Sequence, residues 1–550
     1  EIRIRDWSSD VCSSDLKTKS FATSFPFELD EFQLQACYAV EEGKGVLVAA
    51  PTGAGKTIVG EFAVNLVINF GGKCFYTTPI KALSNQKYSE LCEKYGESKI
   101  GLLTGDTSLN SEAQVVVMTT EVLRNMIYSN STTIKDLKYV VMDEVHYLAD
   151  KFRGAVWEEI LIHLSDSVQV ISLSATVSNA EEFGEWLQTV RGRTEIVVSE
   201  IRPVPLYQHV LFGNRLVDLF DDNLKLNPEL MKLERETYRK YHGSWKDRPR
   251  GPKPLNRSEV MEKLDRELLL PAITFIFSRN ACDAAVRQCL ASGIRLTNSQ
   301  ERASIREIIA KNIKLLAEED LVVLGYYEWA DALERGIAAH HAGLLPAFKV
   351  TVEELFQKGL VKAVFATETL ALGINMPART VVLEKLSKWN GEAHVAISPG
   401  EYTQLTGRAG RRGIDIEGNA VILWSNDLDS TSVGGLASTR TYPLRSSFKP
   451  TYNMSINLIS QFGADRARTS LESSLAQFQA DKAVVGLARQ IRKSENARDL
   501  LLNESKCELG NFHEYANLRN DIKRLESDGR KNRKKRQEIE EAIAQIRRSI

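Results

Sequence analysis

Ala50-Pro-Thr-Gly-Ala-Gly-Lys-Thr57 is the stretch that decides the fold. The apolar run Val46–Ala49 precedes it and is typical of a buried parallel strand, and residues 58–70 follow it with helical spacing. A glycine-rich turn between a strand and a helix is the usual setting of a phosphate-binding loop, because backbone N–H groups and the helix N-terminus converge there on an anion. The stretch therefore predicts a nucleotide site in an α/β domain.

Each residue type in this loop has a chemical role. Gly53 and Gly55 let the backbone approach an anion without a Cβ clash. Lys56 would reach the β- and γ-phosphates, and the Thr57 hydroxyl would bind Mg²⁺. Ala50 stands where the simplest motif has glycine, so the flanking strand and helix support the identification. The residues predicted to hold the nucleotide here are Pro51, Thr52, Gly53, Ala54, Gly55, Lys56 and Thr57.

The composition is that of an ordinary globular protein with several domains. The 550 residues suffice for roughly three to four domains. Hydrophobic residues make up 43% and charged residues 26%, and the formal net charge is −1. A net charge so close to zero excludes a global basic field, so any nucleic-acid binding must use local grooves.

Cysteine usage and apolar runs bear on the compartment. The seven cysteines include no C-x-x-C pair, which argues against a zinc or iron–sulfur site and favours a reducing, cytoplasmic setting. No apolar run is long enough to span a bilayer, and no signal peptide is recognised at the N-terminus. Residues 1–16 resemble a translated sequencing-adapter remnant, so residues 1–24 are interpreted as a disordered or non-native segment. A natural disordered tail is the alternative for residues 1–16.

Short apolar, β-branched segments alternate with helical segments up to residue 200. The predicted strands span residues 74–78, 100–103, 115–118, 139–142 and 168–173. Such alternation indicates a doubly wound α/β domain over residues 25–200. In open α/β sheets ligands bind beyond the carboxyl ends of the strands, so polar residues at those ends are candidates for a site.

Phe27 and Gln33 precede the phosphate-binding loop and suit adenine recognition. The Phe27 ring would stack on the base, and the Gln33 amide would pair with its edge. A position in the hydrophobic core is the alternative for Phe27.

Tyr139-Val-Val-Met-Asp-Glu-Val-His146 is the second strong signal. It places Asp143 at the end of an apolar strand, where a Walker B acid holds Mg²⁺ through water. Glu144 would orient and activate the attacking water, and His146 would connect the nucleotide site to the rest of the protein. After a later strand, Ser174 and Thr176 could couple two sites through hydroxyl hydrogen bonds, with a helix cap as the alternative.

Two further strand ends carry candidate contacts to a nucleic-acid strand. Pro79 and Lys81 follow one strand, and Thr119 and Thr120 follow another. Hydroxyls, backbone N–H groups and helix N-termini are common partners of phosphates. Ordinary helix N-caps are the alternative for these residues.

The middle of the chain is predicted to connect two α/β domains. Residues 197–213 alternate like a β-ribbon and residues 214–268 are polar and charged, so residues 201–268 are interpreted as a ribbon with a mobile insertion. The second α/β domain, residues 269–428, has predicted strands at residues 272–277, 336–343, 362–367 and 380–383. It has no phosphate-binding loop of its own.

Gln404-Leu-Thr-Gly-Arg-Ala-Gly-Arg-Arg-Gly413 is the most specific motif of the second domain. Arg408 and Arg411 are three residues apart and are predicted to lie on one helical face. Directed at a nucleotide on the first domain, they would act as arginine fingers on the γ-phosphate, with Gln404 in the same catalytic set. A nucleotide held between two domains would make closure depend on ATP and opening follow its loss.

Together the motifs resemble those of the superfamily-two DExH helicases. They occur in the order Phe27 and Gln33, then residues 50–57, 79–86, 104–106, 119–124, 143–146, 174–176, 277–280, 340–346, 367–377 and 404–413. Within that superfamily the chain is similar to the superkiller-type RNA helicases, and nearest to their bacterial HelY-like group. The resemblance covers residues 25 to about 520.

The resemblance implies an ATP-dependent RNA helicase with two tandem RecA-like domains. Its cofactors would be ATP and Mg²⁺, and its substrate single-stranded or 3′-tailed duplex RNA. It would translocate 3′ to 5′ as a monomer in RNA processing or decay, beside a ribonuclease and without membrane contact. The resemblance also implies nucleic-acid contacts at Ser278, Arg279, Thr367 and Trp389, and a nucleotide contact at Gly373.

The C-terminal part extends the resemblance. Residues 385–397 have an Asn390-Gly391 turn between alternating arms, which is a hairpin signal, and in the family a hairpin here separates the strands. Residues 429–490 resemble the family's winged-helix domain. Residues 491–550 resemble the start of its helical stalk, and their apolar spacing favours a helical hairpin or a coiled-coil arm. Because the family normally continues through a longer arm and a helical bundle, the chain is expected to be a fragment.

Two other functions stay open at the level of sequence. A DNA-repair helicase of the same architecture would share these motifs, because they contact sugar and phosphate. A partner-dependent scaffold or ATPase that remodels ribonucleoproteins would unwind little by itself. Competition between RNA and DNA would separate the first alternative, and a full-length chain that binds RNA but leaves tailed duplexes intact would favour the second.

Overall fold

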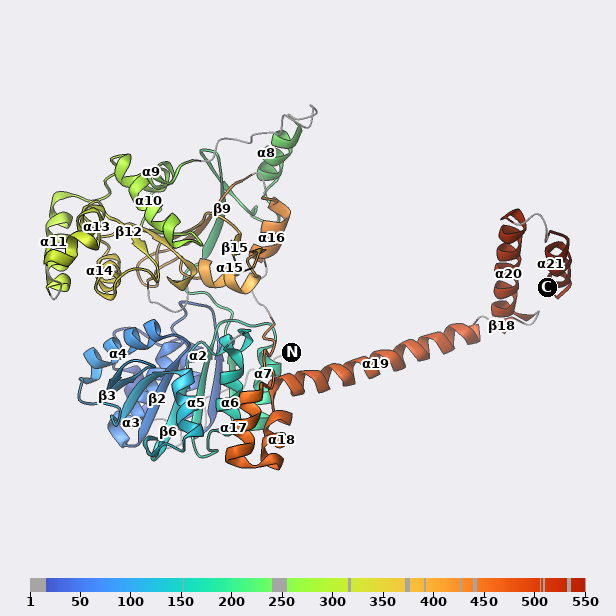
Figure 1. Ribbon diagram of the computed structural model, residues 1–550, viewed down its shortest axis with the longest axis horizontal. Coiled ribbons are helices and arrows are strands. Elements are labelled where there is room, and N and C mark those ends of the chain that lie inside the picture. Colours follow the sequence, from blue (N-terminus) through green and yellow to red (C-terminus); the bar gives the residue numbers. More distant parts are fainter. Residues whose placement is uncertain are drawn as a thin grey trace. The chain divides into compact units, whose positions relative to one another are not determined.

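A computed structural model describes most of the chain (Figure 1). The described residues are 16–151, 153–239, 255–314, 318–370, 376–389, 392–425, 428–438, 443–504, 506–507, 510–531 and 536–549. The chain divides into two compact units, Glu1–Leu475 and Ala476–Ile550. The first unit holds two large sheets, and each sheet has its own hydrophobic core.

The first sheet has eight strands in the order β4-β3-β5-β2-β6-β7-β1-β8. The edge strand β4 runs antiparallel to β3, and the other described pairs are parallel. The strands are β1 (Gly45–Ala49), β2 (Lys73–Thr78), β3 (Ile100–Leu103), β4 (Ser108–Leu109), β5 (Val115–Thr119), β6 (Leu137–Met142), β7 (Gln169–Ser174) and β8 (Thr194–Val198). The strands predicted from the sequence are all present, because a parallel sheet covered on both faces needs such apolar runs.

Helices flank the first sheet (Figure 1). They are α1 (Leu16–Ala22), α2 (Glu31–Glu41), α3 (Thr57–Phe70), α4 (Lys81–Tyr95), α5 (Thr120–Tyr128), α6 (Gly154–His163) and α7 (Ala180–Arg191), with the short helices η2 (Thr132–Ile134) and η3 (Val145–Ala149). Gly60 lets α3 pack closely on the sheet, because a Cβ there would lie 2.9 Å from a methyl group of Val141. This packing fixes the start of α3 beside the loop that follows β1.

The second sheet has seven strands in the order β10-β9-β17-β14-β11-β13-β12. The edge strand β10 is antiparallel to β9, and the other described pairs are parallel. The strands are β9 (Leu206–Phe212), β10 (Arg215–Asp218), β11 (Ala272–Phe275), β12 (Ile337–His340), β13 (Ala363–Ala366), β14 (Thr380–Leu383) and β17 (Gly418–Leu423). The two sheets are those of tandem RecA-like domains, as the fold prediction stated.

The interpretation of residues 201–268 as a connector is wrong for its first part. β9 and β10 do pair as a ribbon, but β9 also pairs in parallel with β17, more than 200 residues later in the chain. The helices α8 (Pro228–Arg239) and α9 (Arg257–Arg266) follow in the same segment. The alternating sequence signalled the ribbon but could not reveal its distant partner, so the second sheet starts earlier than predicted.

The remaining helices of the second sheet follow its strands in the chain. They are α10 (Arg279–Ala291), α11 (Ser299–Ile313), α12 (Glu318–Val323), α13 (Tyr326–Glu334), α14 (Pro346–Gln357), η4 (Glu368–Leu370), α15 (Pro399–Thr406) and α16 (Ser430–Ser438). The arms of the predicted hairpin pair as β15 (Ser387–Trp389) and β16 (His394–Ala396). Its turn, Asn390-Gly391, lies outside the described residues.

The winged-helix prediction for residues 429–490 is not confirmed. The described part of this range contains α16, α17 (Tyr452–Phe462), α18 (Ala464–Glu472) and the start of α19 (Leu475–Glu504), and no strand. Residues 443–475 lie against the first sheet's helices. The Trp186 indole N–H donates to the Ser473 carbonyl at 2.8 Å, and the buried Glu158 carboxylate accepts hydrogen bonds from the Leu475 N–H at 2.7 Å and from the Ser446 hydroxyl.

The second unit is helical. The long helix α19 leads to the short strand pair β18 (Lys506–Cys507) and β19 (Gly510–Asn511), followed by α20 (Phe512–Lys531) and α21 (Arg536–Ser549), which pack together. Among the described helices, none combines the length and the apolar character that a bilayer crossing requires.

Candidate nucleotide site and its links between the two sheets

The phosphate-binding loop connects β1 to α3. Gly53 and Gly55 have φ angles of 84° and 83°, in the left-handed region that favours glycine. The Lys56 ammonium donates to the carbonyls of Ala50 and Pro51, at 2.9 and 3.1 Å. Burial lowers the pKa of Lys56, while Glu144 and Asp143 oppose this shift. The lysine therefore closes the loop on itself and would exchange these carbonyls for phosphate oxygens.

The Gln33 side chain is buried against this loop. Its Oε1 accepts the Asp30 N–H at 2.9 Å, and its Nε2 donates to the Gly55 carbonyl at 3.0 Å and to the Ala54 carbonyl at 3.3 Å. A Cβ at Gly55 would lie 2.8 Å from the same amide nitrogen, so this close approach requires glycine. Gln33 supports the loop in this structure, and its pairing with adenine stays a prediction.

Phe27 is 49% exposed and contacts the Phe25 ring, with 5.4 Å between the ring centroids. This exposure argues against the alternative in which Phe27 belongs to the core. The ring is therefore available for stacking on a base, which stays a prediction.

The Asp143 carboxylate lies just beyond β6 and is buried. Its Oδ2 accepts the Tyr76 hydroxyl at 2.9 Å, and its Oδ1 accepts the Glu144 N–H at 2.9 Å. Burial, and then Glu144, raise the pKa of Asp143 to about 6, and the opposing influences come in order from Lys87, Tyr76 and Lys56. Glu144 is the N-cap residue of η3 and has a left-handed φ of 55°.

The His146 ring contacts three segments of the site. Nδ1 accepts the Ala175 N–H at 3.3 Å and lies 3.4 Å from a Glu144 carboxylate oxygen, and Nε2 lies 2.7 Å from the Gln404 amide nitrogen. Burial, then Lys56, lower the pKa of His146 to about 3, so the ring is neutral at physiological pH. The contact to Gln404 links the two sheets.

The predicted hydroxyl coupling at residues 174–176 takes another form. Ser174 Oγ is buried and has no hydrogen-bond partner among the described residues, and Thr176, two residues later, is also buried. The link from this segment to His146 is made by the Ala175 backbone N–H. A backbone group carries no sequence signal, so sequence reasoning could not assign it.

The prediction that Arg408 and Arg411 lie on one helical face is wrong. Helix α15 ends at Thr406, and Gly410, with a φ of 84°, turns the chain between the two arginines. Arg411 donates from Nε and Nη2 to the Asp415 carboxylate, each at 2.8 Å. Arg408 is buried, and although burial lowers its pKa, Glu144 opposes this shift. Of the two arginines, Arg408 is the one whose pKa is influenced by Glu144 of the first domain.

Arg412 reaches the first sheet and was missed from the sequence. Its Nη1 donates to the Ala54 carbonyl at 2.9 Å, and its Nη2 donates to Asp30 Oδ1 at 3.0 Å. Arg412 lies next to Arg411 in the same motif, and this position was the only sequence feature that could have pointed to it. Arg412 contacts the phosphate-binding loop where Arg411 was predicted to act.

The residues predicted to contact nucleic acid on the first sheet occupy strand ends. The Pro79 carbonyl accepts from Arg153 at 3.2 Å, and Lys81 pairs with the exposed Asp106. Thr119 is the N-cap residue of α5 without a side-chain cap bond. Thr120 is buried, and its hydroxyl donates to the Thr78 carbonyl at 3.1 Å, so that hydroxyl has a structural partner.

On the second sheet the predicted contact residues vary in exposure. Ser278 caps α10 by accepting the Ala281 N–H at 3.4 Å, and Arg279 is exposed beside it. The Thr367 hydroxyl lies 2.9 Å from that of Thr369, and Trp389 on the hairpin is 56% exposed. Gly373 lies outside the described residues.

A cleft of about 570 Å³ adjoins the His146–Gln404 contact. Its lining includes Tyr147, Lys151, Phe277, Glu368, Lys388 and Gln404, so residues of both sheets and of the hairpin meet there. Lys388 is held by Glu368 at 2.7 Å and by Glu401.

Comparisons with known proteins agree with this arrangement. Residues 30–183 match the family DEAD/DEAH box helicase, and residues 295–413 match the helicase conserved C-terminal domain. The chain is 59% identical to the probable helicase HelY of Mycobacterium tuberculosis, over 92% of this chain and 57% of that protein.

Two eukaryotic relatives are more distant. The DExH-box ATP-dependent RNA helicase DExH9 of Arabidopsis thaliana is 36% identical over 92% of this chain and 52% of its own length. The human exosome RNA helicase MTR4 is 38% identical over 86% of this chain and 46% of its own length. The chain thus spans about half the length of these relatives.

Proposed function

We propose that this chain, which belongs to the superkiller-like DExH-box helicases of superfamily two, uses ATP hydrolysis at its first sheet to move along RNA and unwind it. The observation that supports this most is the 2.7 Å contact between His146 and Gln404. It joins residues 143–146, which follow β6 of the first RecA-like sheet, to residues 404–413 of the second RecA-like domain. A nucleotide at the first sheet would thereby influence how the two sheets meet.

The chain's own residues would carry out hydrolysis. Lys56 would leave the carbonyls of its loop and bind the β- and γ-phosphates. Glu144 would accept a hydrogen bond from the attacking water and orient it. Arg408 would place positive charge beside the γ-phosphate, and Arg411 would join it once released from Asp415.

Mg²⁺ fits the residues at this site. Asp143 offers a buried carboxylate that accepts hydrogen bonds from a hydroxyl and an N–H group, and Thr57 offers a hydroxyl at the start of α3. Oxygen ligands of this kind suit Mg²⁺. When bound, the ion neutralises charge on the β- and γ-phosphates. Asp143 would hold it through water and Thr57 directly.

The finer parts of the proposal follow from the family. They are 3′-to-5′ translocation, a role in RNA processing or decay beside a ribonuclease, a monomeric state and a cytoplasmic location. The name of the human relative, an exosome RNA helicase, supports the link to RNA decay. Base-sequence specificity should be low, because contacts to sugar and phosphate carry no sequence information.

Steady-state ATP hydrolysis, with single-stranded RNA or DNA of matched length, tests this function. Salt must be fixed, because phosphate contacts make nucleic-acid affinity steeply salt-dependent. We expect stimulation by RNA to exceed that by DNA, and Lys56→Ala to abolish turnover. Undiminished hydrolysis in Lys56→Ala would overturn the ATPase assignment. Equal or greater stimulation by DNA would favour the DNA-repair alternative.

Gln404→Ala tests the link between the sheets. Losing one neutral hydrogen bond between the sheets should reduce RNA-stimulated hydrolysis by about 3- to 10-fold. Gln169→Ala is the matched control, because the Gln169 amide donates to the Val40 and Lys44 carbonyls within the first sheet's own domain. Equal losses in both variants would show that the contact has no special role in coupling.

A further inference from the structure

Lys87 of α4 lies in a cluster of charged side chains that includes Glu61 and Glu90. Only 8% of its side chain is exposed. Its ammonium lies 2.7 Å from a Glu90 oxygen and 3.8 Å from a Glu61 oxygen. Although burial lowers the pKa of Lys87, Glu90 and Glu61 outweigh it and the net shift is upward. Lys87 is therefore a permanently charged group inside the first domain.

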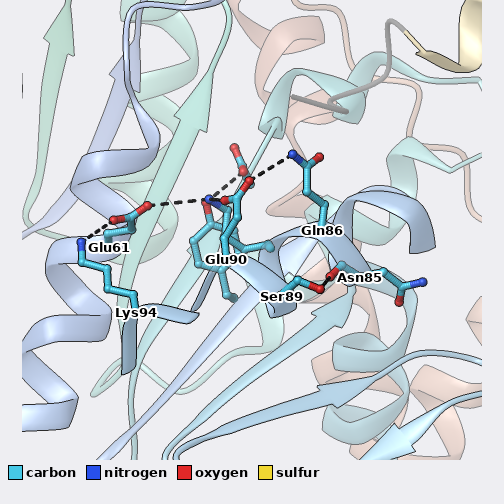
Figure 2. Close-up of polar contacts among 9 residues, drawn as sticks. Glu61, Asn85, Gln86, Ser89, Glu90 and Lys94 are labelled. Atoms are coloured by element: carbon cyan, nitrogen blue, oxygen red, sulfur yellow. Dashed lines mark hydrogen bonds and ion pairs between the residues drawn. The ribbon is translucent and has the colours of Figure 1, made fainter. Parts of the chain in front are cut away.

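The rest of the cluster fixes the two carboxylates. Lys94, further along α4, pairs with the second oxygen of Glu61 at 2.9 Å, and Gln86 donates to the second oxygen of Glu90 at 3.0 Å. Figure 2 shows Glu61, Gln86, Glu90 and Lys94 in one network of contacts. The two lysines differ in surroundings, because 39% of the Lys94 side chain is exposed.

Tyr76 of β2 connects Lys87 to the Walker B carboxylate. The Lys87 ammonium lies 5.6 Å from the centroid of the Tyr76 ring, within the range of a cation–π contact. Tyr76 is fully buried, and its hydroxyl donates to Asp143 Oδ2 at 2.9 Å.

Each carboxylate oxygen of Asp143 therefore accepts a hydrogen bond from a neighbouring group of the protein. Oδ2 is held by Tyr76 and Oδ1 by the Glu144 N–H. A carboxylate held by two donors keeps one orientation, and groups that hold a metal ligand in this way commonly tune its affinity for the ion. Lys87 supplies positive charge behind this arrangement without itself pairing with Asp143.

We propose that Tyr76 and Lys87 are positioning residues for Asp143, which they turn and hold for a divalent cation. The Lys87 ammonium fixes the Tyr76 ring, and the Tyr76 hydroxyl fixes Oδ2. The inference rests on the proposed ATP and Mg²⁺ function. It assigns a role to two residues outside the nucleotide-contacting set.

The test measures how much Mg²⁺ strengthens nucleotide binding. The dissociation constant of a fluorescent N-methylanthraniloyl ADP is measured in excess Mg²⁺ and in EDTA, and the ratio of the two gives the contribution of the metal. Tyr76→Phe, which removes one oxygen, and Lys87→Met should each reduce this ratio by about tenfold or more. The affinity in EDTA should stay within about twofold, which also shows that each variant is folded.

Lys94→Met is the matched control, because Lys94 binds the same Glu61, while the rings that it approaches are those of Phe21, Phe25 and Tyr95. Its ratio should equal that of the unmodified chain. The double variant Tyr76→Phe/Lys87→Met should lose less than the product of the two single losses, because both residues act through one carboxylate.

The outcomes separate the two proposals. A normal ratio in Tyr76→Phe, or an equal loss in Lys94→Met, would overturn the positioning role while leaving the proposed ATPase intact. If the unmodified chain bound the nucleotide no better with Mg²⁺ than with EDTA, the proposed metal-dependent function itself would fail. If Lys87→Met did not fold, Tyr76→Phe alone would still decide the result.

Discussion

The two sheets share one architecture but differ in the charges they bury. The first sheet's domain buries Lys56, Lys87, Asp143, Glu158 and Glu159. In the second, the buried ionisable groups near the described strand ends are two histidines and Arg408, and each histidine contacts a more exposed carboxylate. Buried charges are costly unless paired or bound to a metal, so they mark the half in which chemistry is expected.

The first turns after β1 and β11 show the same difference. β1 leads into a loop with two glycines in the left-handed region, which opens a cradle at the start of α3. β11 leads into α10, where the Ser278 side chain already accepts an N–H of the first helical turn. A helix N-terminus that is capped by its own serine has less capacity left for an anion. The same topology therefore places a glycine-rich turn without a side-chain cap at the start of α3 and a serine-capped turn at the start of α10.

The strongest way to break this comparison is to neutralise one acid in each half. Glu144→Gln should reduce ATP turnover by about 10²- to 10⁴-fold, because it removes the group that we propose orients the water. Asp283→Asn, which changes the partner of His341 in the second half, should leave turnover within about twofold. Both are measured as steady-state rates at saturating ATP. A similar loss in both variants would contradict the division of roles.

The fold was largely readable because its signals are local. The apolar strands and the loop at residues 50–57 each have a pattern within a few residues. The partners in the site were not readable, because they depend on register and distant packing. Tyr76 pairs with Val141 across β2 and β6, which brings its hydroxyl to Asp143. Nothing near Tyr76 in the sequence indicates this.

The motif at residues 404–413 illustrates the same limit. The prediction from the sequence identified the arginines and Gln404, but it assumed that one helix continues through them. The structure ends α15 at Thr406 and lets Arg412 reach Asp30, 382 residues away in the chain. Side-chain direction after a helix end depends on the exact turn, and the sequence pattern does not specify it.

A second comparison concerns the buried acid that anchors residues 443–475 to the first half. Glu158→Gln keeps the shape but turns an amide N–H₂ group toward a donor, so we expect the free energy of unfolding to fall by about 1–3 kcal/mol. Glu93→Gln, at an exposed position of α4, is the control and should change little. Chemical denaturation followed by tryptophan fluorescence reports it, since Trp186 contacts the same segment. An unchanged transition would show that the anchor contributes nothing.

The low pKa of His146 predicts a pH dependence specific to the first half. The unfolded chain binds a proton near pH 6.5, whereas burial, then Lys56, lower the folded-state pKa to about 3, against an opposing influence of Asp143. Glu144 and Gln404 also face the ring. The folded state therefore loses about 1.4 kcal/mol for each pH unit below 6.5, and gains or loses nothing from this group above it.

His146→Asn should remove that slope. The test compares the free energy of unfolding of both chains between pH 7.5 and pH 5.5, where the difference should grow by about 1.4 kcal/mol. Asp143 titrates in the same range with the opposite sign, because its pKa is raised, but it is present in both chains. Parallel curves would mean that His146 accepts a proton in the folded state.

The smallest effect is expected from an ion pair of the second half in which an arginine binds both oxygens of a glutamate. Arg257 of α9 donates from Nε and Nη2 to both oxygens of Glu384, at 2.8 and 2.9 Å, with about a quarter of each side chain exposed. Arg257→Lys keeps the charge but loses the two-point geometry, so the loss should be about 0.5–1 kcal/mol. Because the pair is partly in water, the loss should shrink as NaCl is raised from 0.05 to about 0.5 M. The loss in Glu158→Gln should not shrink, because that carboxylate is fully buried. If both losses responded equally to salt, burial would not be what distinguishes the charges of the two halves.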